Sequence, residues 1–204
     1  MTDGSASVRT ALVEEGGEHL AAALDYAARW GPAGAGVLPL DGKVPVDPAT
    51  GRPMVDWHRR ATADPATLRC WWSERAWNVG VAPRGAFIAL DIDRRHGDDD
   101  RLHELEQELG ELPPTSTYQT SDGWRVLLAS PGVPLASEID GIKIVFKKGQ
   151  IVMPPSVHPT GFVYRWEADL GASAHGSSAL PRPARGSRPA TRHPQPRPGR
   201  ARAG

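Results

Sequence analysis

Two aspartates one residue apart close an apolar stretch near the middle of the chain. The segment FIALDIDRRHGDDD, residues 87–100, ends its apolar part with Asp91 and Asp93. In a β-strand, residues i and i+2 point to the same face, so the two carboxylates would lie side by side while Ile92 faces the core. Like charges this close favour a cation between them. Mg²⁺ accepts such oxygen ligands, often together with substrate phosphates, so the pair predicts a divalent metal site.

A structural explanation of the same pair stays open. Aspartate is common where strands end, because its side chain supports turns. Carboxylates are also favourable at the start of a helix, where the backbone N–H groups are unpaired. The residue types and spacing therefore point to a metal site without excluding an ordinary strand end.

The surrounding pattern predicts helices packed on strands. Helical spacing covers residues 18–30 and 98–110. A third helix is expected in TADPATLRCWWSERA, where Thr62 or Asp64 can cap and Pro65 fits the first turn. NVGVAP and FIALDI are expected as adjacent strands, and TSTYQT and WRVLLAS as a hairpin joined at SDG. The fold class is therefore α/β (α+β), with a mixed, mainly antiparallel sheet and packed helices.

Composition excludes several classes of protein. No apolar run approaches the roughly 20 residues that span a bilayer, and the first residues lack the apolar core of a signal peptide. The single cysteine, Cys70, fits a reducing compartment. We therefore expect a cytoplasmic protein with no membrane partner.

Charge divides the chain into unequal parts. The formal net charge is zero, but residues 171–204 hold seven arginines and no acid, which leaves the remainder acidic. This Arg-, Pro- and Gly-rich stretch has too few large apolar residues to offset its ordering entropy, so 171–204 is predicted to be a disordered tail. We expect one folded domain over 18–170 and a flexible N-terminus over 1–17.

The order of motifs resembles a known family. GKVP, DWHRRATADPATLRCWW, NVGVAP, IALDIDRRHG, GELPPTSTYQTSDGWRVLL and GQIVMPPSVHPTGFVYRW follow one another over residues 19–167. This arrangement resembles the N-terminal domain of bifunctional DNA primase/polymerases, in the archaeo-eukaryotic primase superfamily. The resemblance implies a nucleotidyltransferase that extends primers on a single-stranded DNA template, with Mg²⁺ or Mn²⁺ as cofactor.

The resemblance also implies roles for particular residues. Asp91 and Asp93 would be the catalytic, metal-binding pair. Arg125 would contact the nucleoside triphosphate, as would Ser156 and His158 from the loop PPSVHPTG. The chain contains no Gly-Lys-Thr/Ser phosphate loop, so a replicative helicase, where one acts, is expected on a separate polypeptide.

This sequence departs from the family pattern at two positions. The family carries a Gly-Gly-Arg-His run whose histidine contacts the nucleotide, whereas GWRVLL aligns Val126 with that histidine. The family also places a third carboxylate before the Pro-Pro-Ser motif, where this chain has Lys143. A charged lysine cannot bind Mg²⁺, but it can pair with Asp91 and Asp93.

Two main functions follow, and the identity of residue 143 bears on the choice. One is a primase/polymerase weakened by Val126 and Lys143. The other is a catalytically degenerate module that binds nucleotides or single-stranded DNA. A metal-dependent nuclease is a third and weaker alternative, because paired acids also serve hydrolysis.

Overall fold

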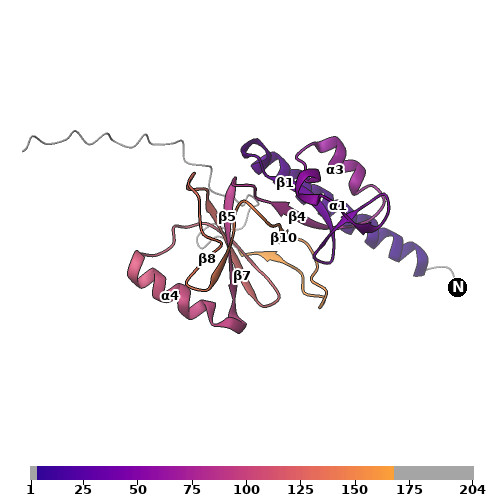
Figure 1. Ribbon diagram of the computed structural model, residues 1–204. Helices are drawn as coiled ribbons and strands as arrows, with labels where there is room; N and C mark the ends of the chain where they lie inside the picture. Colours follow the sequence, from indigo (N-terminus) through magenta and orange to yellow (C-terminus); the bar gives the residue numbers. More distant parts are fainter. Residues whose placement is uncertain (1–3, 168–204) are drawn as a thin grey trace, which may run out of the picture.

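Two antiparallel sheets and the helices around them form the part of the protein that the structure describes (Figure 1). The structure is a computed structural model and describes the backbone of residues 4–167 and the side chains of residues 17–167. The predicted tail 171–204 lies outside the described residues. The α/β class predicted from the sequence is confirmed, with two sheets in place of one.

The first sheet has the strand order β10-β4-β1-β2-β3. Its strands are β1 (Gly36–Asp41), β2 (Val44–Asp47), β3 (Arg52–Pro53), β4 (Asn78–Ala82) and β10 (Ile151–Met153). Strand β4 pairs with β1 and β10, and every one of these pairings is antiparallel.

The second sheet has the order β11-β6-β7-β5-β9-β8 and carries the aspartate pair. Its strands are β5 (Phe87–Asp93), β6 (Ser116–Gln119), β7 (Gly123–Ala129), β8 (Glu138–Ile139), β9 (Ile142–Val145) and β11 (Arg165–Trp166). Strand β5 lies between β7 and β9, so Asp91 and Asp93 belong to a strand with neighbours on both sides. The hairpin predicted between TSTYQT and WRVLLAS is confirmed as β6 and β7.

One expected pairing is wrong. The strands predicted from NVGVAP and FIALDI are β4 and β5, and they belong to different sheets. The four residues between them include Arg84 and Gly85, both with positive φ, which redirect the backbone from one sheet to the other. Their short connection therefore links sheets and does not close a hairpin.

Helices cover the sheets on separate sides (Figure 1). Helices α1 (Gly4–Trp30), α2 (Trp57–Arg60) and α3 (Pro65–Trp71) belong to the first half, and α4 (Asp98–Leu109) to the second. Single-turn 3₁₀ segments follow α1 at Gly31–Ala33 and precede α4 at Arg94–His96. Of the two caps predicted for α3, Thr62 and Asp64, the structure uses Asp64, whose carboxylate accepts a hydrogen bond from the Thr67 N–H at 2.8 Å.

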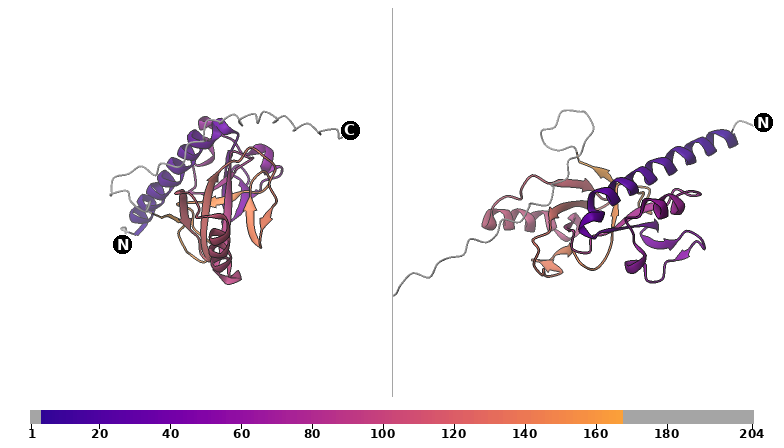
Figure 2. Two further views of the ribbon diagram at one scale, coloured as in Figure 1. Left: turned by 90° about the vertical axis from the view of Figure 1, so that its left-hand side faces the viewer. Right: turned by 90° about the horizontal axis from the view of Figure 1, so that it is seen from above.

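Helix α1 is longer than the sequence suggested. The segment 1–17 was expected to be flexible, but α1 begins at Gly4 and runs without interruption to Trp30 (Figure 2). A glycine costs a helix about 1 kcal/mol relative to alanine, which weakens a helix without ending it. The Gly16–Gly17 pair is therefore no helix boundary here.

Two apolar clusters hold the second sheet in place. The larger cluster joins α1, the first sheet and one face of the second sheet, and includes Trp30, Phe87 and Ala89. The smaller cluster packs α4 against the opposite face through Leu90 and Ile92. Because side chains alternate along β5, Asp91 and Asp93 lie on the same face as Phe87 and Ala89, at the polar end of that face.

Candidate functional site

Asp91 is held by an arginine from the neighbouring strand. Asp91 and Arg125 are directly opposite each other in β5 and β7. The Arg125 guanidinium donates Nε–H to Asp91 Oδ1 at 3.0 Å and a terminal N–H to Asp91 Oδ2 at 3.1 Å. The side chains are only 15% and 27% exposed, so this bidentate pair is largely shielded from water.

The same arginine joins the two sheets. Tyr118 on β6 is fully buried, and its hydroxyl donates to the carbonyl oxygen of Val152 on β10 at 2.8 Å. Arg125 reaches both the Tyr118 hydroxyl and the Val152 carbonyl, at 3.4 Å each. Burial raises the pKa of Tyr118 to about 12, so its hydroxyl stays protonated and available as a donor. The Asp91–Arg125 pair therefore lies where β10 of the first sheet meets the second.

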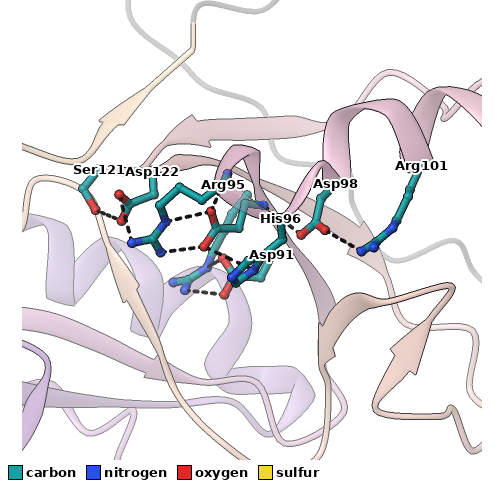
Figure 3. Close-up of polar contacts among 9 residues, drawn as sticks. Asp91, Arg95, His96, Asp98, Arg101, Ser121 and Asp122 are labelled. Atoms are coloured by element: carbon teal, nitrogen blue, oxygen red, sulfur yellow. Dashed lines mark hydrogen bonds and ion pairs between the residues drawn. The ribbon is translucent and has the colours of Figure 1, made fainter.

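Asp93 is held by a second arginine, from the turn that follows β5. The Arg95 side chain donates to both Asp93 oxygens, at 3.0 and 2.6 Å, and its backbone N–H donates to Oδ1 at 2.9 Å. Arg95 also lies 3.3 Å from a carboxylate oxygen of Asp122 (Figure 3). Both predicted metal-binding carboxylates are thus engaged by guanidinium groups.

The start of α4 supports the end of β5. Asp98 is 3% exposed, and its carboxylate accepts a hydrogen bond from the Asp93 backbone N–H at 2.9 Å. Its other oxygen pairs with Arg101 at 3.2 Å (Figure 3). Asp98, the first residue of this helix, therefore positions the backbone of Asp93.

Gly123 allows the two strands to approach at the site. It lies opposite Asp93, and a Cβ atom added there would stand 1.9 Å from the carbonyl oxygen of Ile92. Such a distance is far inside van der Waals contact, so a side chain at this position would separate β7 from β5. The glycine that precedes Trp124 and Arg125 in the sequence thus keeps Arg125 within reach of Asp91.

Val126 lies on the face of β7 that points away from the aspartate pair. It is 3% exposed and packs with Leu90 and Ile92 in the α4 cluster, on the face opposite Asp91. A β7 side chain that contacts a ligand beside Asp91 must share the face of Asp91, and that residue is Arg125. On β7, the side chain that shares the face of Asp91 is therefore a cation, Arg125.

Lys143 lies where the sequence placed it. It is directly opposite Asp91 in β9, and paired residues of an antiparallel ladder share a face. Its side chain is exposed, and within residues 17–167 it makes no ion pair. Asp91 is therefore flanked by a cationic residue on each neighbouring strand, Arg125 on β7 and Lys143 on β9.

The two residues of the PPSVHPTG loop differ in their accessibility. Ser156 is fully buried, its hydroxyl accepts from the Val79 N–H at 2.8 Å, and it donates to the Val79 carbonyl at 3.3 Å. The expectation that Ser156 contacts a phosphate is therefore not met, because both functions of its hydroxyl are used to join this loop to β4. The structure makes Ser156 a link between backbone segments.

His158 remains accessible at the edge of the site. It is partly exposed, and its Nδ1 lies 2.8 Å from the Thr160 hydroxyl. Partial burial lowers the pKa of His158, and the positive charges of Lys43 and Arg95 lower it further. The imidazole is therefore neutral at pH 7. Because Nδ1 accepts a hydrogen bond from the Thr160 backbone N–H at 3.2 Å, the proton lies on Nε2, which can donate one hydrogen bond.

The donor set does not fit a divalent metal ion in this arrangement. Asp91 and Asp93 each use both oxygens for an arginine, and Lys143 stands where a further carboxylate would complete the site. Among the described residues, no group of three or more His, Cys, Asp or Glu side chains is placed to hold a metal. Asp91, Asp93 and Asp122 are balanced by Arg95, Arg125 and Lys143 without an added cation.

Comparison with known families agrees with this architecture. The model of the family described as bifunctional DNA primase/polymerase, N-terminal, matches residues 23–185. The chain belongs to this family. A search of curated proteins gave no match. The primase/polymerase domain thus contains all of β5, β7 and β9, the three strands that bring Asp91, Arg125 and Lys143 together.

Some site residues of this primase/polymerase domain had not been predicted from its sequence. Arg95 and Asp122 lie in turns, and Tyr118 reads as an ordinary core aromatic residue. The Arg-Arg pair that directly follows Asp93 was the available signal for Arg95, because a residue two positions along a turn can return to the aspartate side chain. Between residues 4 and 167, no helix has the length and apolar character needed to cross a bilayer.

Replacing Arg95 by glutamine is expected to raise the pKa of Asp93. The hydrogen bonds from Arg95 hold this pKa at about 2, against an ordinary value of 3.8. Because the folded-state pKa is depressed, the pair stabilises the fold above about pH 4 and loses its contribution as the pH falls toward 2. Arg95 is 64% exposed, so we expect a contribution below about 1 kcal/mol.

A carbon-detected NMR titration of the Asp93 carboxyl group in both proteins measures this change. The difference in stability between the two proteins should vanish near pH 2. A pKa that stays at its original value in Arg95→Gln would show that the guanidinium is not the cause.

Proposed function

We propose that this primase/polymerase domain binds nucleoside triphosphates and single-stranded DNA, and transfers nucleotides weakly or not at all. Family membership supports binding of DNA and nucleotides. The observation that carries the rest is the cationic flank of Asp91, with Arg125 on one neighbouring strand and Lys143 on the other. Lys143 stands where the family pattern places a carboxylate, and both Lys143 and Arg125 attract phosphate directly.

The cations at the site differ in how readily they can contact a phosphate. Lys143 is exposed and has no carboxylate partner within residues 17–167, so its ammonium can contact a phosphate without first breaking an ion pair. Arg95 is 64% exposed and can exchange Asp93 for a phosphate oxygen. Arg125 is more enclosed and serves mainly to neutralise Asp91. His158 adds a neutral hydrogen-bonding group at the edge.

A metal-dependent nucleotidyltransferase is the second candidate. It is favoured by the placement of Asp91 and Asp93 on one face at the end of a central strand. In that case Mg²⁺ or Mn²⁺ would be held by these two carboxylates, and both arginines would first have to release them. A separate replicative helicase would supply the single-stranded template in either case.

Nucleotide binding with and without metal separates the two candidates. We expect dATP to bind in EDTA with an affinity within about threefold of that in Mg²⁺, because protein cations contact the phosphates. Lys143→Gln should weaken binding roughly fivefold, which corresponds to one exposed charge contact of about 1 kcal/mol. Isothermal titration calorimetry measures both values. The matched control is Arg69→Gln, which removes one positive charge from an exposed side chain on α3.

Primer extension completes the test. A labelled primer on a single-stranded DNA template, with Mn²⁺ or Mg²⁺ and all four nucleotides, should be extended slowly or not at all. Binding that is lost in EDTA, together with rapid extension in Mn²⁺, would overturn the proposal and support the metal-dependent enzyme.

A further inference from the structure

A second cationic site lies where the chain crosses between the two sheets. A groove of about 530 Å³ is lined there by Trp57, His58, Ala82, Arg84, Lys147, Lys148 and Gly149. No lining residue is acidic, although residues 1–170 carry all the acids of the chain. Three of the seven lining residues are permanently charged cations. The groove is therefore a positively charged surface on an otherwise acidic domain.

The walls of this groove are connected by specific contacts. Arg84 has a positive φ and donates hydrogen bonds to the carbonyl oxygens of His58 and Ala61, the latter at 3.0 Å. On the other side, the Gly85 N–H donates to the Phe146 carbonyl at 3.2 Å, directly before the two lysines. The segment after α2, the β4–β5 crossover and the β9–β10 turn are thus joined around one opening.

The side chains in the groove suit an unpaired polynucleotide strand. Lys147 and Lys148 are exposed, and Trp57 is partly exposed on α2. Aromatic side chains beside a row of cations bind single strands, because any base can stack on the ring while the cations contact phosphates. Trp57 packs in part against the larger apolar cluster, and a base can stack on the exposed remainder of its ring.

We propose that this groove binds single-stranded DNA, with Trp57 stacking on a base and Arg84, Lys147 and Lys148 contacting phosphates. The inference rests on the proposed binding of single-stranded DNA and names the surface that carries it. Binding here is independent of base sequence, because the groove offers a ring face and charges. It also favours single strands over duplexes, since stacking requires an unpaired base.

Fluorescence anisotropy with a fluorescein-labelled dT20 strand tests the groove in the full chain. Lys147→Gln/Lys148→Gln should weaken binding roughly tenfold at 0.1 M salt and lower the slope of log K against log salt by about 1.4, or 0.7 for each lost phosphate contact. The matched control Arg69→Gln/Arg165→Gln removes two exposed charges outside the groove and should change neither value. All variants carry the same arginine-rich tail.

Variants of Trp57 test the stacking role separately. Trp57→Leu keeps an apolar side chain without a ring and should weaken binding about fivefold or more, whereas Trp57→Phe should retain most of the affinity. A duplex of the same length should bind more weakly than dT20 and should not respond to Trp57→Leu. Equal losses with Leu and Phe, or equal losses on duplex and single strand, would overturn the stacking contact.

The outcomes also distinguish this inference from the proposed function. If the unchanged protein binds dT20 but the lysine variant keeps its affinity and salt slope, the assignment of DNA binding to the groove is wrong, while the proposal of DNA binding stands. If the unchanged protein does not bind dT20, both fail. Binding of dATP at the Asp91 site should be equal in the unchanged protein and the lysine double variant.

Discussion

Lys143→Asp is expected to strengthen Mn²⁺ binding and to raise primer extension by roughly 100-fold, the scale of one electrostatic contact in an active site. Residue 143 is directly opposite Asp91, so the Cβ atoms of the pair are about 5 Å apart. A carboxylate on β9 would add oxygen ligands on the face that already carries Asp91 and Asp93. The substitution also removes the positive charge that repels a divalent ion.

Stability gives this prediction a second measurement. Two carboxylates directly opposite each other in a ladder cost about 0.2–1 kcal/mol when nothing lies between them. We therefore expect Lys143→Asp to melt at a lower temperature than the unchanged protein in EDTA and to regain stability on addition of Mn²⁺. Differential scanning fluorimetry over a Mn²⁺ series measures the effect independently of activity.

The matched control for this change is Lys143→Asn. It has the shape of the aspartate without its charge, so it should relieve the repulsion of metal and add little affinity. Should Asn and Asp increase Mn²⁺ binding equally, the missing carboxylate is not what limits the site. If neither variant changes Mn²⁺ binding, the arginines remain bound to Asp91 and Asp93 and prevent their carboxylates from binding the metal.

Asp91→Asn is expected to lower the free energy of unfolding by about 2–4 kcal/mol, because it leaves the largely buried Arg125 guanidinium without its charge partner. Arg125 is only 15% exposed, and its two short hydrogen bonds both go to Asp91. The remaining acceptors, Tyr118 and Val152, lie at 3.4 Å and carry no formal charge. Urea denaturation followed by tryptophan fluorescence measures the change.

Two further variants isolate the charge pair. Asp91→Asn/Arg125→Met removes both charges and should recover much of the lost stability, which a double-mutant cycle measures as coupling energy. Asp93→Asn is the matched control. Its partner Arg95 is 64% exposed, so this substitution should lower the free energy of unfolding by less than about 1 kcal/mol. Equal costs for Asp91→Asn and Asp93→Asn would contradict the argument from burial.

This difference affects how activity measurements are interpreted. A loss of nucleotide binding in Asp91→Asn can follow from partial unfolding at the junction of the two sheets. Asp93 lies on the same face, but its partner Arg95 is solvent-exposed and belongs to a turn. Asp93→Asn is therefore the better variant for testing whether the paired carboxylates act in chemistry.

Local sequence patterns were sufficient to predict the secondary-structure elements and part of the candidate site. Alternation along FIALDID placed Asp91 and Asp93 on one strand face, and the motif order indicated the family that the comparison confirmed. Counting back from Pro-Pro-Ser also placed Lys143 opposite the acidic pair. These features depend on residues close together in the sequence or on the order of segments, and both can be read from the sequence.

Long-range pairing decided the rest. The assignment of β4 and β5 to different sheets, the inward direction of Arg125 with Val126 on the opposite face, and the burial of Ser156 all depend on which strands meet and in which register. A shift of one residue in a strand moves every side chain to the other face, so an alignment uncertain by one position cannot tell which residue faces the site. Tertiary structure alone brought Arg125 onto Asp91, because this ion pair requires groups on separate strands to meet at hydrogen-bonding distance. The Arg95–Asp93 pair is local, because the two residues lie in one turn.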